Sequence, residues 1–455
     1  MNASADPNST TGLSRAAPGL VGFLHFFTLG AALPLLPLYL KGTLGYSWTV
    51  TGAILTAIPF SLLIAQVFVR SLSQFGIDVR LGLAVSHLFA AGIAMAAAFR
   101  TELTADAASD WRYVFGFSVL YFSLLAPSMS WIARVGDAAT SSGRSMIRHW
   151  RVWGTVGFIA PAWLCEFVLV RFSNLVPMVE SHEILIPVAG WAGLATAFAA
   201  ILLPEVEPEP EHRGGGGGGA EAGAGSASTS RLGVSLAAAV LMVVVVQRCH
   251  YLWNAPFFES ILNAHAVERQ FVHRLTVSDQ VFELIGLFLL GTGVMKFGTR
   301  VMLTVGASAW LGRAILLAWM SQSSPSGQVA MASLFGAQVL QGVAIAAFFG
   351  TLGVILKLHL GVSACRFQIM LVSVCGIFGM LIGGVIADDI LASSPGFMLN
   401  ELPGLVGISA TEHPDITRWL QGWSGVWCLS AIPCLLAVFL TGLSKTASVS
   451  LDRPR

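Results

Sequence analysis

The sequence has few charged residues, and this scarcity excludes several classes of protein. Asp, Glu, Lys and Arg make up 11% of the 455 residues, whereas 55% are hydrophobic. A soluble globular domain carries about 25% charged residues, so we expect an integral membrane protein. The formal net charge is +1 and the Lys and Arg residues are dispersed. No basic patch is present that would neutralise phosphates, so nucleic acid is not an expected partner.

Metal-binding and catalytic patterns are also missing. The six cysteines lie in apolar segments without metal-ligand spacing, and no histidine is followed by an acid five positions later. We therefore expect no cofactor and no metal, and a polytopic membrane enzyme is a minor alternative. The first residues are polar and lack both a charged n-region and a small-residue cleavage site, which predicts no cleaved signal peptide.

The sequence instead contains many long apolar segments. A hydrocarbon core about 30 Å thick needs about 20 apolar residues per helix, and on this criterion we predict twelve transmembrane helices. The predicted spans are residues 18–40, 49–70, 79–99, 111–134, 145–171, 184–203, 232–256, 276–295, 300–320, 328–357, 366–391 and 417–442. The predicted fold class is an all-α membrane protein, embedded in a lipid bilayer.

A segment of different composition separates the sixth span from the seventh. It contains alternating Pro and Glu, then the glycine run Gly214 to Gly219, then Ala, Gly and Ser. Such a sequence buries nothing and is typical of a flexible linker. We therefore predict three parts, a six-helix bundle over 1–203, a cytoplasmic linker over 204–231 and a second six-helix bundle over 232–455. This is the plan of a major facilitator transporter, where substrate binds between the halves near the midplane.

The basic residues predict the orientation. Most Lys and Arg fall on one side of the predicted spans, for example Arg134, Arg144 and Arg148 at or near the junction of the fourth and fifth spans. Because cytoplasmic loops carry the excess of Lys and Arg, we place both termini in the cytoplasm. The expected location is the cytoplasmic (inner) membrane, with multiple passes.

Polar residues interrupt two spans of the second half at helical spacing. In the seventh span, Gln247, His250 and Asn254 are spaced i, i+3 and i+7 and share a face. In the eighth, Gln280 and Glu283 lie three residues apart, and an apolar run follows Glu283. A carboxyl in that setting is costly to ionise, so we interpret Glu283 as a site of reversible protonation. The alternative is a hydrogen bond that only holds two helices together.

Other intramembrane polar residues are weaker candidates. Arg313 is a candidate to neutralise a carboxylate, and Gln338 and Gln341 are candidates to hydrogen-bond a ligand. For His25 and His87, a proton relay is one interpretation, but a satisfied packing role is the more common one for such a histidine.

An arginine, a hydroxyl and an aromatic ring share one face at the start of the fifth span. These are Arg151, Thr155 and Phe158, spaced i, i+4 and i+7. An arginine leading into an apolar helix is tolerated mainly where it faces a wet cavity or a partner inside the bundle. We therefore expect a polar cavity beside this face.

Together, the stretch Arg151-Val152-Trp153-Gly154-Thr155-Val156-Gly157-Phe158 and the pair Gln280-x-x-Glu283 resemble signatures of the nucleoside:H+ symporter family of the major facilitator superfamily. The resemblance implies the substrate-binding residues Arg151, Thr155, Phe158, Gln247, His250, Gln280, Glu283 and Gln341. Glu283 and His250 are the residues expected to couple transport to protons. In the tenth span, the family's tyrosine, phenylalanine and aspartate fall on Gln341, Ile345 and Ala346.

The predicted function is proton-coupled import of nucleosides or related small polar metabolites by alternating access. We expect a monomeric carrier that is not an enzyme. Thr155, Gln280 and Glu283 can pair with ribose hydroxyls or base edges, and Phe158 can stack on a base. Sugars would be served by much the same groups, so a sugar or glycoside symporter of the same fold is the alternative. A non-transporting sensor built on the same helices is another.

Overall fold

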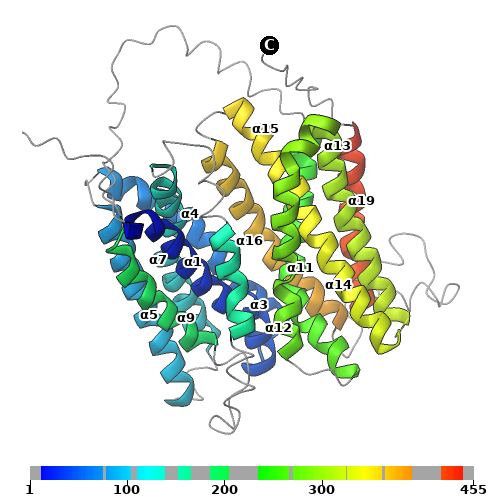
Figure 1. Ribbon diagram of the computed structural model, residues 1–455. Helices are drawn as coiled ribbons and strands as arrows, with labels where there is room; N and C mark the ends of the chain where they lie inside the picture. Colours follow the sequence, from blue (N-terminus) through cyan, green and yellow to red (C-terminus); the bar gives the residue numbers. More distant parts are fainter. Residues whose placement is uncertain are drawn as a thin grey trace, which may run out of the picture. The chain divides into compact units, whose positions relative to one another are not determined.

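The computed structural model is helical throughout the part of the chain that it describes (Figure 1). The described residues are 12–74, 78–103, 110–138, 152–164, 185–203, 234–265, 270–323, 325–360, 364–391 and 422–443. By internal contacts the chain falls into two compact units, Met1–Leu36 with Phe60–Arg213, and Pro37–Pro59 with Gly214–Arg455. The predicted linker over 204–231 lies outside the described residues, and the predicted domain boundaries stay a prediction.

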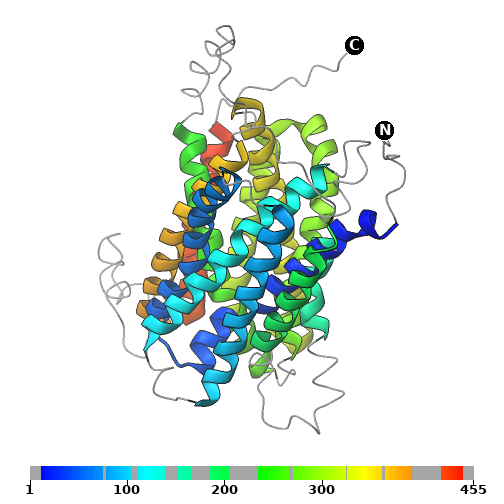
Figure 2. The same ribbon diagram turned by 90° about the vertical axis from the view of Figure 1, so that its left-hand side faces the viewer.

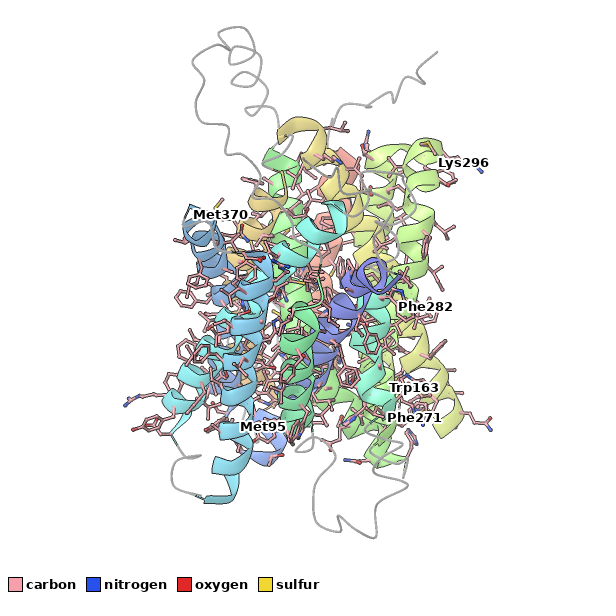
Figure 3. The ribbon with its side chains drawn as sticks, turned by 60° about the vertical axis from the view of Figure 1, so that its left-hand side comes forward. Met95, Trp163, Phe271, Phe282, Lys296 and Met370 are labelled. Atoms are coloured by element: carbon pink, nitrogen blue, oxygen red, sulfur yellow. The ribbon has the colours of Figure 1, made fainter. Side chains whose placement is uncertain are left out.

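The first unit packs its helices lengthwise against one another, as the blue and cyan ribbons show in Figure 2. The contacts of α1 and α5 with α9 are the most extensive, and α7 packs against both α1 and α5. At one such contact, Met95 of α5 (Figure 3) lies against Gly190 of α9, where a Cβ atom would come within 3.1 Å of the methionine Sδ. The helices of this unit are α1 Gly12–Ala32, α4 Ala57–Gln74, α5 Val79–Leu103, α7 Trp111–Ala138, Val152–Leu164 and α9 Leu185–Ala200.

The second unit is built around α13, which packs against α14, α15, α19 and η3. Helix α11 packs against α16 and α19, and α16 also packs against α3. The helices of this unit are α2 Leu36–Leu38, η1 Tyr39–Thr43, α3 Trp48–Leu55, α11 Val234–Ala264, α12 Gln270–Val277, α13 Asp279–Ser323, α14 Gly327–Ala344, η3 Ile345–Phe349, α15 Gly350–Leu360, α16 Ala364–Leu391 and α19 Gly422–Leu443.

Each predicted span overlaps an apolar helix among the described residues. Nine helices there are long and apolar enough to cross a membrane, and Val152–Leu164 and Ile186–Ala200 are shorter apolar helices. Two predicted spans, 276–295 and 300–320, both fall within the apolar segment Phe271–Ser323, on either side of a non-helical residue, Gly298. Multiple membrane passes are therefore confirmed, whereas the number twelve stays a prediction.

Gly298 separates these two spans within α13. Its φ of 81° and ψ of 162° kink α13 at the predicted boundary, in a backbone region that is essentially restricted to glycine. In the first predicted span, prolines interrupt the helix. The span predicted over 18–40 is interrupted after Ala32, because Pro34 and Pro37 have no N–H to donate to the preceding turn.

Candidate functional site

A chain of hydrogen-bonded polar side chains, buried except for the half-buried Gln341, crosses the interior of the second unit. It connects α13 to α11 and α14. Arg313 donates through a terminal nitrogen to Asn254 Oδ1 at 2.6 Å. Asn254 Nδ2 donates to Gln341 Oε1 at 3.2 Å, and Gln341 Nε2 donates to Asp279 Oδ2 at 2.7 Å. Every donor in this chain is directed from the guanidinium toward the carboxylate.

Arg313 also contacts a second branch, on α11 and α19. Its other terminal nitrogen lies 2.9 Å from His250 Nδ1. Because a guanidinium can only donate, His250 Nδ1 accepts this bond, and Nε2–H is left to donate to Ser430 Oγ at 3.0 Å. Ser430 in turn donates to the Trp427 carbonyl at 2.8 Å, and the Trp427 ring lies under the guanidinium at 5.4 Å. The tautomer of His250 is thereby fixed by its neighbours.

Both ends of the polar chain are removed from solvent. Arg313 is 0% exposed and Asp279 is 4% exposed. They make no direct ion pair; Asn254 and Gln341 bridge them. A buried charge is tolerated when it is paired and hydrogen-bonded, so the two amides and the opposite charge at the far end explain how this apolar bundle holds both ions.

The predicted site residues fall in different surroundings. Thr155 and Phe158 are half-buried on helix Val152–Leu164 in the first unit, whereas Arg151 lies outside the described residues. In the second unit, His250 and Gln341 belong to the polar chain described above. The remaining three, Gln247, Gln280 and Glu283, are half-buried on α11 and α13.

Helical spacing predicted some of this arrangement. His250 and Asn254 were expected to share a face of α11, and both contact Arg313. Arg313 was expected to neutralise a carboxylate, and the hydrogen-bonded chain leads from it to one. That carboxylate is Asp279, which was not among the predicted residues.

Asp279 could have been identified from its position. It lies four residues before Glu283, hence on the same face of α13, and directly before Gln280. The sequence favoured Glu283 instead, because a long apolar run follows it. Figure 3 labels two residues of α13 that lie before the kink at Gly298. Phe282 is next to Glu283, and Lys296 is two residues before Gly298.

The tenth predicted span changes its helical hydrogen bonding in the middle. Residues Ile345–Phe349 form a π-helical turn between α14 and α15, a feature often found at functional sites. Ala346 is 1% exposed, and a Cβ atom built on Gly286 of α13 would lie 2.6 Å from the Ala346 Cβ. The small side chain of Ala346 therefore allows close packing against α13.

The side-chain amide of Gln338 is hydrogen-bonded to the backbone of a neighbouring helix. Its Nε2 donates to the Leu275 and Thr276 carbonyls at 2.7 and 3.2 Å. These are carbonyls at the end of α12, whose last groups have no partner within the helix. Gln338 therefore joins α14 to the C-terminus of α12.

The glycines after Trp153 hold two helices of the first unit together. A Cβ atom on Gly157 would overlap the backbone carbonyl of Phe23 in α1, and one on Gly154 would come within 2.8 Å of the Phe26 ring. Trp153 itself is 50% exposed and meets the Phe23 ring edge-on at 6.4 Å. Both glycines of this stretch therefore serve close packing, which leaves Thr155 and Phe158 as its candidate ligand contacts.

A pair of histidines is buried in the first unit. His87 Nδ1 lies 3.0 Å from the Leu83 carbonyl, so it donates, and His87 Nε2 is left to accept from His25 Nδ1 at 3.0 Å. Ser128 Oγ lies 3.5 Å from His87 Nδ1. The pair joins α1 to α5, and among the described residues the buried His25 Nε2 has no hydrogen-bond partner.

A comparison with protein-family models and one with solved structures both found matches to this chain. A sequence profile described as Nucleoside H+ symporter matches residues 18–444. The crystal structure of the nucleoside transporter NupG superposes with a TM-score of 0.70 at 15% identity and covers 96% of this chain and 100% of that one. A bacterial homologue of the human lysosomal transporter Spinster, in an inward-facing and occupied conformation, gives a TM-score of 0.64 at 17% identity, covering 95% and 96% of the two chains. No curated protein sequence matches this chain significantly.

Apolar helices long enough to span a membrane, a polar chain inside them and the match to a transporter family define a multi-pass membrane transporter. The solved transporter structures share its fold. The chain belongs to the Nucleoside H+ symporter family, whose profile covers nearly its whole length. It is a proton-coupled nucleoside transporter and not an enzyme.

Proposed function

We propose that this transporter imports nucleosides together with protons by alternating access in the cytoplasmic membrane. It works as a monomer of twelve transmembrane helices, with both termini in the cytoplasm. The positive-inside distribution of Lys and Arg supports the orientation, and the predicted spans support the number of helices.

The observation that carries the proposal is the buried polar chain from Arg313 to Asp279. Charged and amide side chains inside an apolar bundle are expensive, and in membrane proteins they mark solute and proton pathways. The amides of this chain lie on α11 and α14, and its charges on α13. A transporter for an apolar compound would not need such groups.

The proposed nucleoside contacts are the polar and aromatic residues identified from the sequence. Amide and carboxylate groups bind ribose hydroxyls and base edges, and an aromatic ring stacks on the base. The set consists of Arg151, Thr155, Phe158, Gln247, His250, Gln280, Glu283 and Gln341.

Glu283 and His250 are the proposed proton-coupling residues. Glu283 takes a proton from outside, substrate binds, the transporter reorients, and the proton leaves to the cytoplasm. His250 has a more restricted role in the described conformation, because Arg313 donates to its Nδ1. His250 can take a proton on that nitrogen only after Arg313 has moved away.

Uptake into proteoliposomes tests this function. An imposed pH gradient, acidic outside, should drive wild-type protein to accumulate tritiated uridine above its external concentration. Glu283→Gln cannot take up the proton and should stop at equal concentrations. If Glu283→Gln accumulates uridine as well as wild type does, Glu283 is not the coupling residue.

Competition identifies the substrate class. Unlabelled uridine or adenosine should block uptake, whereas sugars at the same concentration should not. Inhibition by a sugar alone would instead favour the sugar symporter considered above.

Asp110→Asn is the control for the Glu283→Gln substitution, because it makes the same carboxylate-to-amide change at the start of α7. Asp110 Oδ1 there accepts the Arg112 N–H at 3.0 Å, and asparagine caps a helix about equally well.

A further inference from the structure

Asp279 is the buried carboxylate of the second unit for which the sequence suggested no role. It is the first residue of α13, is 4% exposed, and accepts from Gln341 Nε2 at 2.7 Å. Gln280 Nε2 lies at 3.5 Å from the same oxygen, Oδ2. A carboxylate this deeply buried is expensive to keep in a membrane bundle, and such acids mark proton relays.

The hydrogen bonds give Asp279 a defined connection to a buried cation. From Arg313 the donors run through Asn254 and Gln341 and end at Asp279 Oδ2. Each amide in this chain uses its oxygen toward Arg313 and its nitrogen toward Asp279. The orientation of both amides is therefore set by having a cation at one end and an anion at the other.

Protonation of Asp279 would disturb this order. A proton on Oδ2 turns the acceptor into a donor, so Gln341 must rotate its amide to offer its oxygen. Gln341 then presents its nitrogen to Asn254, and Asn254 must rotate in turn. That rotation points the Asn254 nitrogen at the Arg313 guanidinium. Because both groups are donors, the Arg313–Asn254 hydrogen bond is lost.

We propose that Asp279 is a second proton-coupling carboxylate of this transporter, and that Gln341 and Asn254 transmit its protonation to Arg313. The proposal deepens the proposed function and rests on it. The proton comes from the outside water, binds Oδ2 of Asp279, and is released to the cytoplasmic water when the chain of hydrogen bonds re-forms. Arg313, freed from Asn254, still contacts His250, so the signal reaches α11 and α19.

The positive charge of Arg313 acts electrostatically on Asp279. Glu283 lies one turn further along the same face of α13, so a proton on either acid relieves repulsion between the two. Helix α14 and η3 carry no titratable side chain. Among the described side chains, the other titratable groups on α13 and on the helices around it are Lys296, Arg300, Arg248, Cys249, His250, Tyr251, Glu259, His273, Arg274, Lys357, Cys428 and Cys434.

Two assays on one preparation separate coupling from binding. Proteoliposomes of phosphatidylethanolamine and phosphatidylglycerol carry wild type, Asp279→Asn or the control Asp110→Asn. Uridine counterflow without a pH gradient reports binding and reorientation, and accumulation under a pH gradient reports coupling. We expect Asp279→Asn to retain counterflow but to stop at equal concentrations, while Asp110→Asn behaves as wild type.

The outcomes are distinguishable from failure of the proposed function. If wild type itself shows neither counterflow nor accumulation of uridine, the proposed function is wrong. If wild type accumulates uridine and Asp279→Asn does so equally well, only the role of Asp279 is refuted.

The connection to Arg313 is tested by stability. Asp279→Asn leaves the buried arginine without its opposite charge, so both single variants, Asp279→Asn and Arg313→Gln, should unfold at lower temperature than wild type. The double variant should lose less than the two single losses added together. If the losses of stability are additive, the two charges are not energetically coupled.

A measurement on the wild type does not depend on how the variants fold. Dicyclohexylcarbodiimide modifies protonated carboxyl groups in apolar surroundings, and mass spectrometry of peptides locates the adduct. We expect Asp279 to be modified increasingly as the pH is lowered. Modification confined to Glu283, or labelling of Asp279 that does not change with pH, would overturn the proposal.

Discussion

The contact between α1 and helix Val152–Leu164 leads to a quantitative prediction about Gly157. A Cβ atom at this position would overlap the Phe23 carbonyl oxygen and lie 2.9 Å from its carbon and 3.0 Å from the Phe23 Cα. All three atoms belong to backbone, so no side chain can rotate away. Overpacking of this kind costs about 1–3 kcal/mol, and replacing a helical glycine recovers about 0.5–1 kcal/mol. We expect Gly157→Ala to lower the free energy of unfolding by about 1–2 kcal/mol.

Gly116 provides the matched control. It is exposed on α7, and a Cβ atom there meets no heavy atom within 4 Å. Gly116→Ala should therefore leave the stability unchanged or raise it by up to about 1 kcal/mol. Thermal unfolding of both variants in detergent, followed by tryptophan fluorescence, compares the same chemical change in the two places. If Gly157→Ala unfolds at the same temperature as Gly116→Ala, the two helices do not pack backbone against backbone.

Two further predictions concern the loop before α5 and the kink in α13. Asp78 lies outside the membrane spans, and the hydrogen bond from the Arg80 side chain lowers the pKa of its carboxyl. A lowered pKa in the folded state means that the stabilisation is complete above the ordinary pKa and is lost as the pH falls through the folded value. The difference in melting temperature between wild type and Asp78→Asn should therefore be largest near neutral pH and shrink in acid; a constant difference would contradict this origin. Gly298→Ala should destabilise by about 1–3 kcal/mol, because φ of 81° with ψ of 162° strains any residue with a Cβ atom; unchanged chemical denaturation would show that α13 is not kinked there.

The sequence predicted the positions of the apolar helices well. Length and hydrophobicity are local properties, and a membrane imposes one length scale on every span. Exceptions occur where a single backbone position decides the outcome. Pro34 ends α1 within a predicted span, and the backbone of Gly298 separates the two predicted spans of α13.

The sequence was less informative about the partners of polar residues. Helical spacing grouped His250 with Asn254 correctly, because both lie on one helix. It could not show that Gln341 on α14 lies between Asn254 and Asp279, since these residues are separated by 87 and 62 positions along the chain. It also favoured Glu283 and overlooked Asp279, because the apolar run after Glu283 is visible in the sequence and the burial of Asp279 is not.

The motif around Trp153 illustrates the same division. From the sequence it predicts a helix with Thr155 and Phe158 on one face, and it identifies the family that the profile confirms. Only the packing of α1 shows that Gly154 and Gly157 are required for close approach of two helices. The sequence by itself determined the membrane class, the helices and the family, since these depend on composition and local pattern. The tertiary structure decided which buried groups are bonded to one another, because hydrogen bonds between helices depend on distances that no local pattern contains.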